Sequence, residues 1–356
     1  MNRLIFGTII LMCACSGPEK EKSTVYSVEE LRHAKGFHFE TKENQRYLVI
    51  DEPWPKATKP IRYLLDKAPK KIVCTSTSHL PFFEMLGEEK LVIGFPNLNY
   101  ISSEVFLKQA EQGLLTDLGP DGSMNMELLL GINPDAVIAF DMGGESKTLD
   151  KIQEAGIPVY YNSDFLEQSP LGRAEWIKFF GALLNKEKEA DSIFSEIEKE
   201  YLRVKKLAST AENKSSILSG VVYGDTWFLP GGNNWAATFF SNAGAAYLWD
   251  SDTTSGWLEL SFEAVYEKGN DAEYWIGTST LNSKDEMLGQ DSRYSSFKAF
   301  EQDKVFNYSK KRGPNGGYDF FESGYSRPDL VLSDLVKIVH PELLPDYQTV
   351  YFQKLQ

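Results

Sequence analysis

Short apolar runs and amphipathic segments alternate along most of the chain. From Lys71 onward, "KIVCTS" predicts a strand, "PFFEMLG" a helix and "KLVIGFP" a strand. "MELLLGI", "DAVIAF", "KTLDKIQEAG" and "IPVYYN" continue as helix, strand, helix and strand. Alternation of this kind is typical of parallel sheets that are covered by helices on both faces. We therefore predict an α/β fold.

The same order returns after Ser215. The predicted strands are "SSILSGVVY", "AAYLWD", "AEYWIG" and "KVFNYS", and the predicted helices are "NNWAATFFSNAG", "SFEAVYEKG" and "SSFKAFEQ". Residues 169–210, between the two series, have no strand pattern. There, "AEWIKFFGALL" predicts one helix, and an apolar stripe from Ala190 to Ala208 predicts a second, long one. We predict two Rossmann-like lobes of matching topology, 71–168 and 211–356, joined by one stiff helix.

Residues 24–70 precede this pattern and differ from it. "GFHFE" and "RYLVIDEPW" alternate between apolar and polar positions around "TKENQ", which predicts a hairpin, and "IRYLL" predicts a further strand. At the other end, "SRPDLVLSDLVKIVHPELLP" predicts a helix that begins at Pro328. The chain thus has a strand-rich N-terminal extension and a C-terminal helix.

The first residues indicate export. Arg3 precedes the apolar run "LIFGTIILM", which is too short to span a bilayer. Residues 1–14 therefore predict a signal peptide, and Cys15, after the small Ala14, is the predicted lipidation site of a bacterial lipoprotein. Residues 15–23 form a polar tether. The alternative is an ordinary secretory signal with Cys15 unmodified. Either way, we expect the protein on the periplasmic or extracellular side of a membrane.

Composition and motifs narrow the function classes. The 356 residues include 37 Lys and Arg against 51 Asp and Glu, a net charge of −14, which disfavours nucleic acid as a partner. The four His are scattered without ligand spacing, so we predict no metal site. The sequence contains no phosphate loop and no nucleophile elbow. We therefore expect no enzyme activity and no cofactor.

One motif occurs twice. "NMELLLGINPDAVIAF" and "SFEAVYEKGNDAEYWIG" each place a Glu, Glu127 or Glu263, in the first turn of a predicted helix. Each Glu is followed at the same distance by Asp-Ala and an apolar strand. An acid at a helix N-terminus is stabilising by roughly 0.3–1 kcal/mol, which explains either residue alone. It does not explain why both series carry the acid at the same place.

These two motifs are where the chain resembles a known family. From about Lys71 to the C-terminus it is similar to the substrate-binding proteins of ABC importers for iron-siderophore complexes and vitamin B12. "MNMELLLGINPDAVIA" and "LSFEAVYEKGNDAEYWI" resemble the two docking motifs of that family, which implies that Glu127 and Glu263 contact permease arginines. "KIVCTSTSHLPFFEMLG" resembles its opening strand, Ser-rich loop and helix, although Pro81 stands where an acid is common.

The resemblance implies a monomeric, lipid-anchored binding protein. Its partners would be an iron-siderophore or corrinoid ligand, a permease dimer with its ATPase, and the membrane through the lipid on Cys15. Two alternatives stay open at this point: a lipid-anchored enzyme on the same scaffold, and an extracytoplasmic ligand sensor. The enzyme would need a paired acid and base in the cleft, and the sensor would not need two symmetric acids.

In doubly wound lobes, ligands bind at the loops that follow the carboxyl ends of the strands. The predicted ligand-binding residues of the first lobe are Ser76, Ser78, His79 and Phe95. Those of the second lobe are Tyr223, Trp227, Trp257, Arg312 and Tyr318. The sequence does not distinguish a siderophore complex, a haem and a cobalamin as the ligand.

Overall fold

The computed structural model describes residues 27–120, 123–143 and 146–356. The predicted signal peptide, Cys15 and the tether lie outside the described residues. Among the described helices, none combines the length and the apolar composition needed to cross a bilayer.

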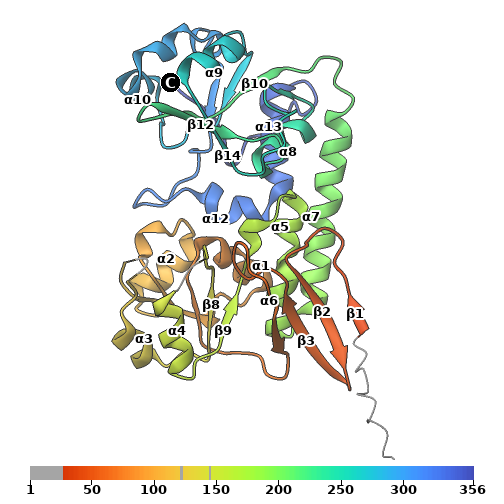
Figure 1. Cartoon of the computed structure of the whole chain (residues 1–356), viewed down its shortest axis with the longest axis vertical. Coiled ribbons are helices and arrows are strands. Elements are labelled where there is room, and N and C mark those ends of the chain that lie inside the picture. Colours follow the sequence, from red (N-terminus) through yellow and green to blue (C-terminus); the bar gives the residue numbers. More distant parts are fainter. Residues whose placement is uncertain (1–26, 121–122, 144–145) are drawn as a thin grey trace, which may run out of the picture.

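Two five-stranded sheets form the centres of two α/β parts, which Figure 1 shows one above the other. The first sheet has the order β7-β6-β5-β8-β9 and is parallel. Its strands are β5 (Ile72–Cys74), β6 (Val92–Phe95), β7 (Thr116–Asp117), β8 (Ala136–Ala139) and β9 (Val159–Tyr161). The second has the order β13-β10-β15-β16-β17, with only β17 antiparallel. Its strands are β10 (Ser216–Leu218), β13 (Ala246–Tyr247), β15 (Tyr274–Ile276), β16 (Val305–Asn307) and β17 (Gln353–Lys354).

The α/β fold class is confirmed, and the predicted match between the halves holds for the sheet centres. In the first sheet β5 lies between β6 and β8, and in the second β10 lies between β13 and β15. The strands β8 and β15 are those that end the two copies of the doubled motif. The edges differ, because β7 extends the first sheet and β17 extends the second at the opposite edge. The domain limits proposed from the sequence stay a prediction.

Helices cover both sheets. Around the first sheet lie α1 (Leu80–Leu86), α2 (Glu104–Glu111), α3 (Met126–Ile132) and α4 (Lys147–Glu154), with 3₁₀ turns η1 (Thr77–His79), η2 (Glu89–Leu91), η3 (Leu98–Tyr100) and η4 (Asp164–Leu166). The connecting helices are α5 (Pro170–Glu175), α6 (Ile177–Leu184) and α7 (Glu187–Ala208). Around the second sheet lie α8 (Trp235–Asn242), α9 (Phe262–Gly269), α10 (Lys284–Gln290), η5 (Ser292–Ser296), α11 (Lys298–Glu301), α12 (Asp319–Ser326) and α13 (Pro328–Val339).

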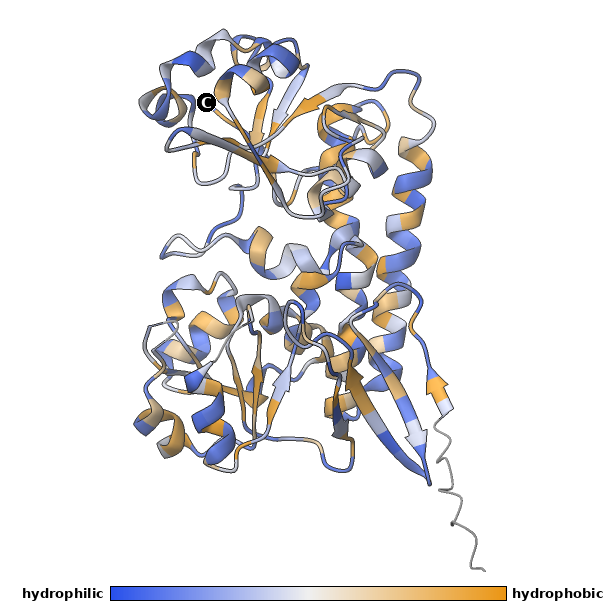
Figure 2. Ribbon diagram, in the orientation of Figure 1, coloured by the Kyte–Doolittle hydropathy of each residue, from blue (hydrophilic) through white to orange (hydrophobic). Residues whose placement is uncertain are grey.

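The long helix α7 belongs to two hydrophobic cores. Its first half buries Ala190, Phe194 and Ile197 in the core of the N-terminal part. Its second half buries Tyr201, Val204 and Ala208 in the core of the C-terminal part. Hydrophobic residues therefore recur along the whole helix between hydrophilic ones (Figure 2). The predicted stripe is confirmed.

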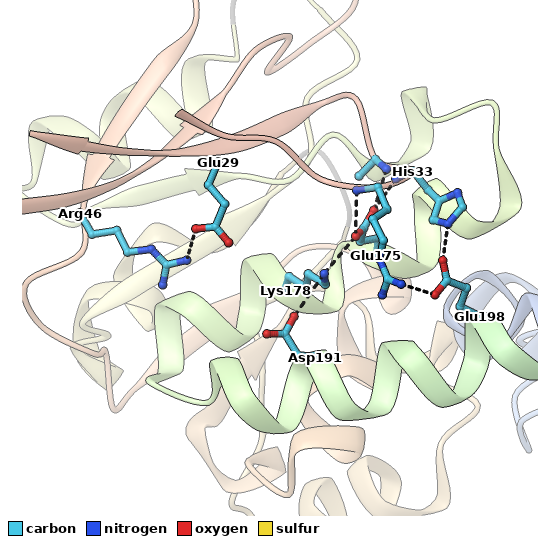
Figure 3. Close-up of polar contacts among 9 residues, drawn as sticks. Glu29, His33, Arg46, Glu175, Lys178, Asp191 and Glu198 are labelled. Atoms are coloured by element: carbon cyan, nitrogen blue, oxygen red, sulfur yellow. Dashed lines mark hydrogen bonds and ion pairs between the residues drawn. The ribbon is translucent and has the colours of Figure 1, made fainter. Parts of the chain in front are cut away.

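The N-terminal extension forms a separate antiparallel sheet, β1-β2-β3-β4. Its strands are β1 (Ser27–Glu29), β2 (Phe37–Lys42), β3 (Gln45–Ile50) and β4 (Ile61–Leu64), so the predicted hairpin and third strand are confirmed. The turn after β1 is anchored to the connecting helices (Figure 3). The buried Glu175 carboxylate accepts the main-chain N–H groups of His33 (2.7 Å), Ala34 (3.0 Å) and Arg32 (3.3 Å). It also pairs with Lys178 (3.1 Å).

The prediction of one strand over "SSILSGVVY" is wrong. The structure breaks it at Ser219 and Gly220, and β10 and β11 (Val221–Tyr223) join different sheets. Gly220 has φ +79°, and a Cβ there would collide with the Phe228 carbonyl. β11 pairs with β12 (Thr226–Pro230), which pairs with β14 (Trp257–Leu260), so an antiparallel sheet stands where we predicted ligand loops.

Other element predictions also need correction. "AEWIKFFGALL" is two helices, because the Trp176 N–H bonds to the Arg173 carbonyl (3.3 Å) and tightens the turn. The helices α2 and α10 were missed. The segment that carries the predicted ligand residues Arg312 and Tyr318 enters α12 at Asp319.

We predict that Glu175→Gln lowers the free energy of unfolding by about 3 kcal/mol, because a charged acceptor of three N–H groups is lost in a buried site. Burial raises the pKa of Glu175, but the N–H donors and Lys178 outweigh it and hold that pKa below its usual value. The stabilisation should therefore be present above the usual carboxyl pKa and be lost as the pH falls through the depressed one. Urea unfolding at several pH values measures both effects.

The matched control is Glu200→Gln, which removes an exposed carboxylate paired with Arg203 (2.7 Å) on α7. Its expected cost is about 1 kcal/mol or less. Equal stability of the Glu175 variant and this control would show that the extension is not held by Glu175.

Candidate ligand cavity and docking helices

A cavity of about 920 Å³ lies mainly in the C-terminal part and reaches the segment between β9 and α6. Its wall residues come from the η4–α5 segment, the antiparallel sheet, α8, the loops after β10 and β15, and the helices α12 and α13. They include Phe165, Leu166, Glu167, Gln168, Arg173, Tyr223, Phe228, Trp235, Phe239, Trp257, Thr280, Tyr308, Phe320, Phe321, Tyr325 and Val331. This volume lies near the upper end of the range for ligand-binding pockets.

Aromatic rings dominate this wall. Tyr308 stacks on Phe320 with 4.7 Å between centroids, and Trp235 contacts Tyr325 edge to face at 5.1 Å. Tyr223 and Trp257 remain 81% and 62% exposed, although each follows or opens a strand of the antiparallel sheet. Exposed aromatic rings beside a cavity are suited to cover the face of a bound ligand.

The polar groups of the wall are few and largely engaged. Arg173 donates to the carbonyls of Asp164 (3.1 Å) and Phe165 (2.9 Å) and lies 4.2 Å from the Tyr325 ring centroid. Burial raises the pKa of Asp164 to about 6. The Trp235 indole N–H is enclosed and has no hydrogen-bond partner in the described chain.

Of the predicted ligand residues, Tyr223 and Trp257 line this cavity. Trp227 does not, because it is fully buried, donates to the Ser219 carbonyl (3.1 Å) and stacks on Trp275. His79 is also fully buried, and burial lowers its pKa to about 3. Phe95 lies in the core of the N-terminal part.

The remaining predicted residues lie outside the cavity wall. Ser76 caps η1 by accepting the Ser78 N–H (3.3 Å), and η1 packs against α12. Arg312 lies 4.7 Å above the Tyr318 ring, and the Tyr318 hydroxyl donates to Asn282 (3.2 Å). These residues support the connection to α12 rather than the cavity surface.

Sequence reasoning missed three parts of the wall. They are the segment around Phe165 and Arg173, the helix position Trp235, and Tyr325 of α12. Phe320 and Phe321 follow the predicted ligand residue Tyr318 closely but were not themselves singled out. The aromatic cluster in "YDFFESGYS" was visible in the sequence. That these rings share one side of a helix could be recognised only once α12 was known to begin at Asp319.

Helix α12 comes from the C-terminal part but is bound to the N-terminal part. The Glu322 carboxylate accepts the N–H groups of Ser102 (2.7 Å) and Ser103 (2.9 Å), just before α2. Gly317 lies so close to the Tyr100 carbonyl that a Cβ there would collide with it. The rings that α12 contributes to the cavity are therefore positioned by contacts with both parts.

The sequence profile of periplasmic binding proteins matches residues 72–311. The chain belongs to the periplasmic binding protein family. The N-terminal sheet lies before the matched region. The chain is also 25% identical over 303 residues to an uncharacterized lipoprotein of Methanocaldococcus jannaschii, covering 80% of this chain and 68% of that one.

Solved structures of periplasmic binding proteins have the same fold. One from Veillonella parvula aligns with a TM-score of 0.62 and 15% identity, covering 85% of this chain and 95% of that one. A periplasmic heme-binding protein from Roseiflexus sp. RS-1 aligns with a TM-score of 0.57 and 18% identity, covering 77% and 99%. The fold class predicted from the sequence, the class III periplasmic-binding-protein fold, agrees with these likenesses.

In this periplasmic binding protein, the helices of the doubled motif occupy equivalent places. Both α3 and α9 lead into the strand beside the first strand of their sheet. Asn125 accepts the Glu127 N–H (3.0 Å), and Ser261 accepts the Ala264 N–H (3.2 Å), so a side chain caps the N-terminus of each helix. Both acids are exposed, and Glu263 lies 3.4 Å from Arg293.

We predict that Glu322→Gln removes a pH dependence of stability. Burial, together with Asp319 and Glu84, raises the pKa of Glu322 from 4.5 to about 8. Because the folded-state pKa is raised, the stabilisation is fully present below about pH 4.5 and is lost as the pH rises through about 8. Melting temperatures measured from pH 4 to 9 should fall across this window in the wild type and much less in the variant.

Glu301→Gln, an exposed acid on α11, serves as the control and should keep the wild-type profile. If Glu322→Gln also keeps that profile, Glu322 does not titrate in this window.

Proposed function

We propose that this periplasmic binding protein captures a siderophore-type iron chelate or a corrinoid outside the cytoplasm and delivers it to an ABC import permease. The observation that carries the proposal is the aromatic cavity, walled by α12 and by the segment from Phe165 to Arg173. Bulky chelates and macrocycles present large apolar faces, which rings such as Trp235, Trp257 and Tyr223 can cover.

Similarity to another binding protein supports a bulky metal complex as the ligand. The solved structures that share the fold include a heme-binding protein from Roseiflexus sp. RS-1. In the described residues, no cluster of three or more His, Cys, Asp or Glu could hold a bare metal ion. A metal would therefore arrive inside its own chelator, as a siderophore complex or a corrinoid.

Delivery to a permease is supported by two matching acids and by exposed leucines next to one of them. Glu127 and Glu263 stand at equivalent helix starts in the two halves, and Figure 1 shows α3 near the bottom and α9 near the top of the molecule. Two separated acids of this kind could contact the two subunits of a permease dimer. The leucines beside Glu127 are also exposed, with Leu128 at 44% and Leu130 at 49%.

Anchoring to the membrane would keep the captured ligand near the permease. We infer that Cys15 carries the lipid, in agreement with the lipoprotein relative from Methanocaldococcus jannaschii. Cys15→Ala should release the protein from the membrane fraction and abolish incorporation of labelled palmitate. Ser16→Ala is the neighbouring control and should leave both unchanged. Continued labelling of the Cys15 variant would place the lipid elsewhere.

Glu127→Lys combined with Glu263→Lys should abolish uptake and leave ligand capture intact. Exposed ion pairs contribute roughly 0.2–1 kcal/mol each, so removing the charges would only weaken docking. Reversing them places like charges opposite the permease arginines. Uptake by cells is measured with isotopically labelled iron chelates and cobalamin, and capture is measured with the purified protein.

Glu154→Lys with Glu301→Lys makes the same change of charge on exposed residues of α4 and α11, away from the starts of α3 and α9, and should transport normally. Normal uptake by the Glu127 and Glu263 variant would refute the docking role. Loss of capture together with uptake would place these acids in the ligand site instead. If the wild type imports none of the chelates, the proposed function is wrong.

A further inference from the structure

The cavity wall carries very little formal charge. Among the described residues that line it, only Glu167 and Arg173 have an acidic or basic side chain other than tyrosine. The other wall residues are aromatic, aliphatic or neutral polar. A ligand in this cavity therefore depends on these two groups for any charge pairing.

Neither group is available for a strong ion pair with a ligand. Glu167 is buried, and one of its carboxylate oxygens accepts the N–H groups of Lys35 (2.8 Å) and Gly36 (2.9 Å) and the Trp176 indole (3.1 Å). It is thus committed to holding the N-terminal extension. An anionic ligand would meet this carboxylate as a like charge.

Arg173 is committed in the same way. It is 7% exposed, donates to two main-chain carbonyls, and lies under the rings of Tyr325 (4.2 Å) and Trp235 (5.1 Å). The nearby Asp164 carboxyl offsets its charge further. Turning the guanidinium toward a ligand would break both hydrogen bonds and uncover a buried acid.

A polyanion would lose its hydration in this cavity without gaining a counterion, whereas a neutral complex would lose much less. The charge of the protein, −14, opposes the approach of an anion as well.

We propose that the cavity selects an electroneutral metal complex with a largely apolar envelope and rejects polyanionic chelates. This inference rests on the proposed function and specifies its ligand class. Fe³⁺ bound by three hydroxamates is neutral, and so is cyanocobalamin. Fe³⁺ bound by three catecholates carries three negative charges, and haem carries two carboxylates.

The test titrates the purified full-length protein in mild detergent with four probes and follows tryptophan fluorescence, since Trp235 and Trp257 lie in the wall. The probes are ferrichrome, cyanocobalamin, ferric enterobactin and haemin. We expect one of the two neutral probes to bind roughly 100-fold more tightly than either anionic one. The neutral probe that binds identifies the ligand as a hydroxamate complex or a corrinoid. Its affinity should be nearly independent of salt from about 0.01 M to 1 M.

A gain-of-charge variant makes the test independent of the wild-type ranking. Thr280 is an exposed wall residue, so Thr280→Arg adds a free cation, and Thr280→Gln adds similar length without charge. Only the Arg variant should gain affinity for ferric enterobactin, by about tenfold, and that gain should disappear in high salt.

Tighter binding of ferric enterobactin or haemin by the wild type would overturn the selection for neutral complexes and leave the proposed function standing. The absence of such a gain in Thr280→Arg would also count against it, because charge would then not limit binding. If none of the four probes binds, both this inference and the proposed function fail.

Discussion

The whole arrangement depends on the apolar stripe of α7, which is buried in two cores at once. Phe194 and Ile197 complete the packing of the N-terminal part, while Tyr201 and Val204 complete that of the C-terminal part. A helix whose hydrogen bonds are internal keeps a fixed rise per residue, so the two cores are held at a set separation. The cavity wall, which draws on residues before and after α7, can form only because of this spacing.

Buried carboxylates then attach segments that are distant in sequence. Glu175 and Glu167 accept the main-chain N–H groups of residues 32–36, and Glu322 accepts those of Ser102 and Ser103. Asp334 on α13 does the same for Tyr351 (2.6 Å) and Phe352 (2.9 Å), next to β17. The bonds to Glu175, whose pKa is held below its usual value, are stronger than neutral ones, and all of these bonds fix the position of a main chain that has no sheet partner there. The extension that precedes the family match is thereby tied to Glu167, a wall residue of the cavity.

The fold could be predicted because each helix and strand is indicated by residues that are close together in the sequence. The cavity could not, because its wall combines segments that are distant in the sequence. The stripe of α7, the strand runs and the caps at Asn125 and Ser261 all depend on neighbouring residues. The antiparallel sheet depends on Gly220, whose positive φ redirects the chain, and this was not evident from an apolar run. Trp227 illustrates the consequence: it was predicted as a ligand contact, but β12 turns it into the core. Tyr223 and Trp257, which were predicted as ligand contacts, do lie on the cavity wall, because the end of one strand and the start of another leave their side chains exposed.

The doubled motif has a topological cause, and its two copies have become different. The helix dipole favours an acid at the start of α3 and, independently, at the start of α9. The acids occupy matching places because each helix directly precedes the strand that lies beside the first strand of its sheet. Arg293 neutralises part of the charge at Glu263, whereas exposed leucines flank Glu127. A partner that meets both helices therefore encounters an acid with apolar neighbours at one end and a partly neutralised acid at the other. The two ends of the molecule present different surfaces, so a partner with two unlike sites would bind it in one preferred orientation, whereas a two-fold-symmetric partner would accept two equivalent ones.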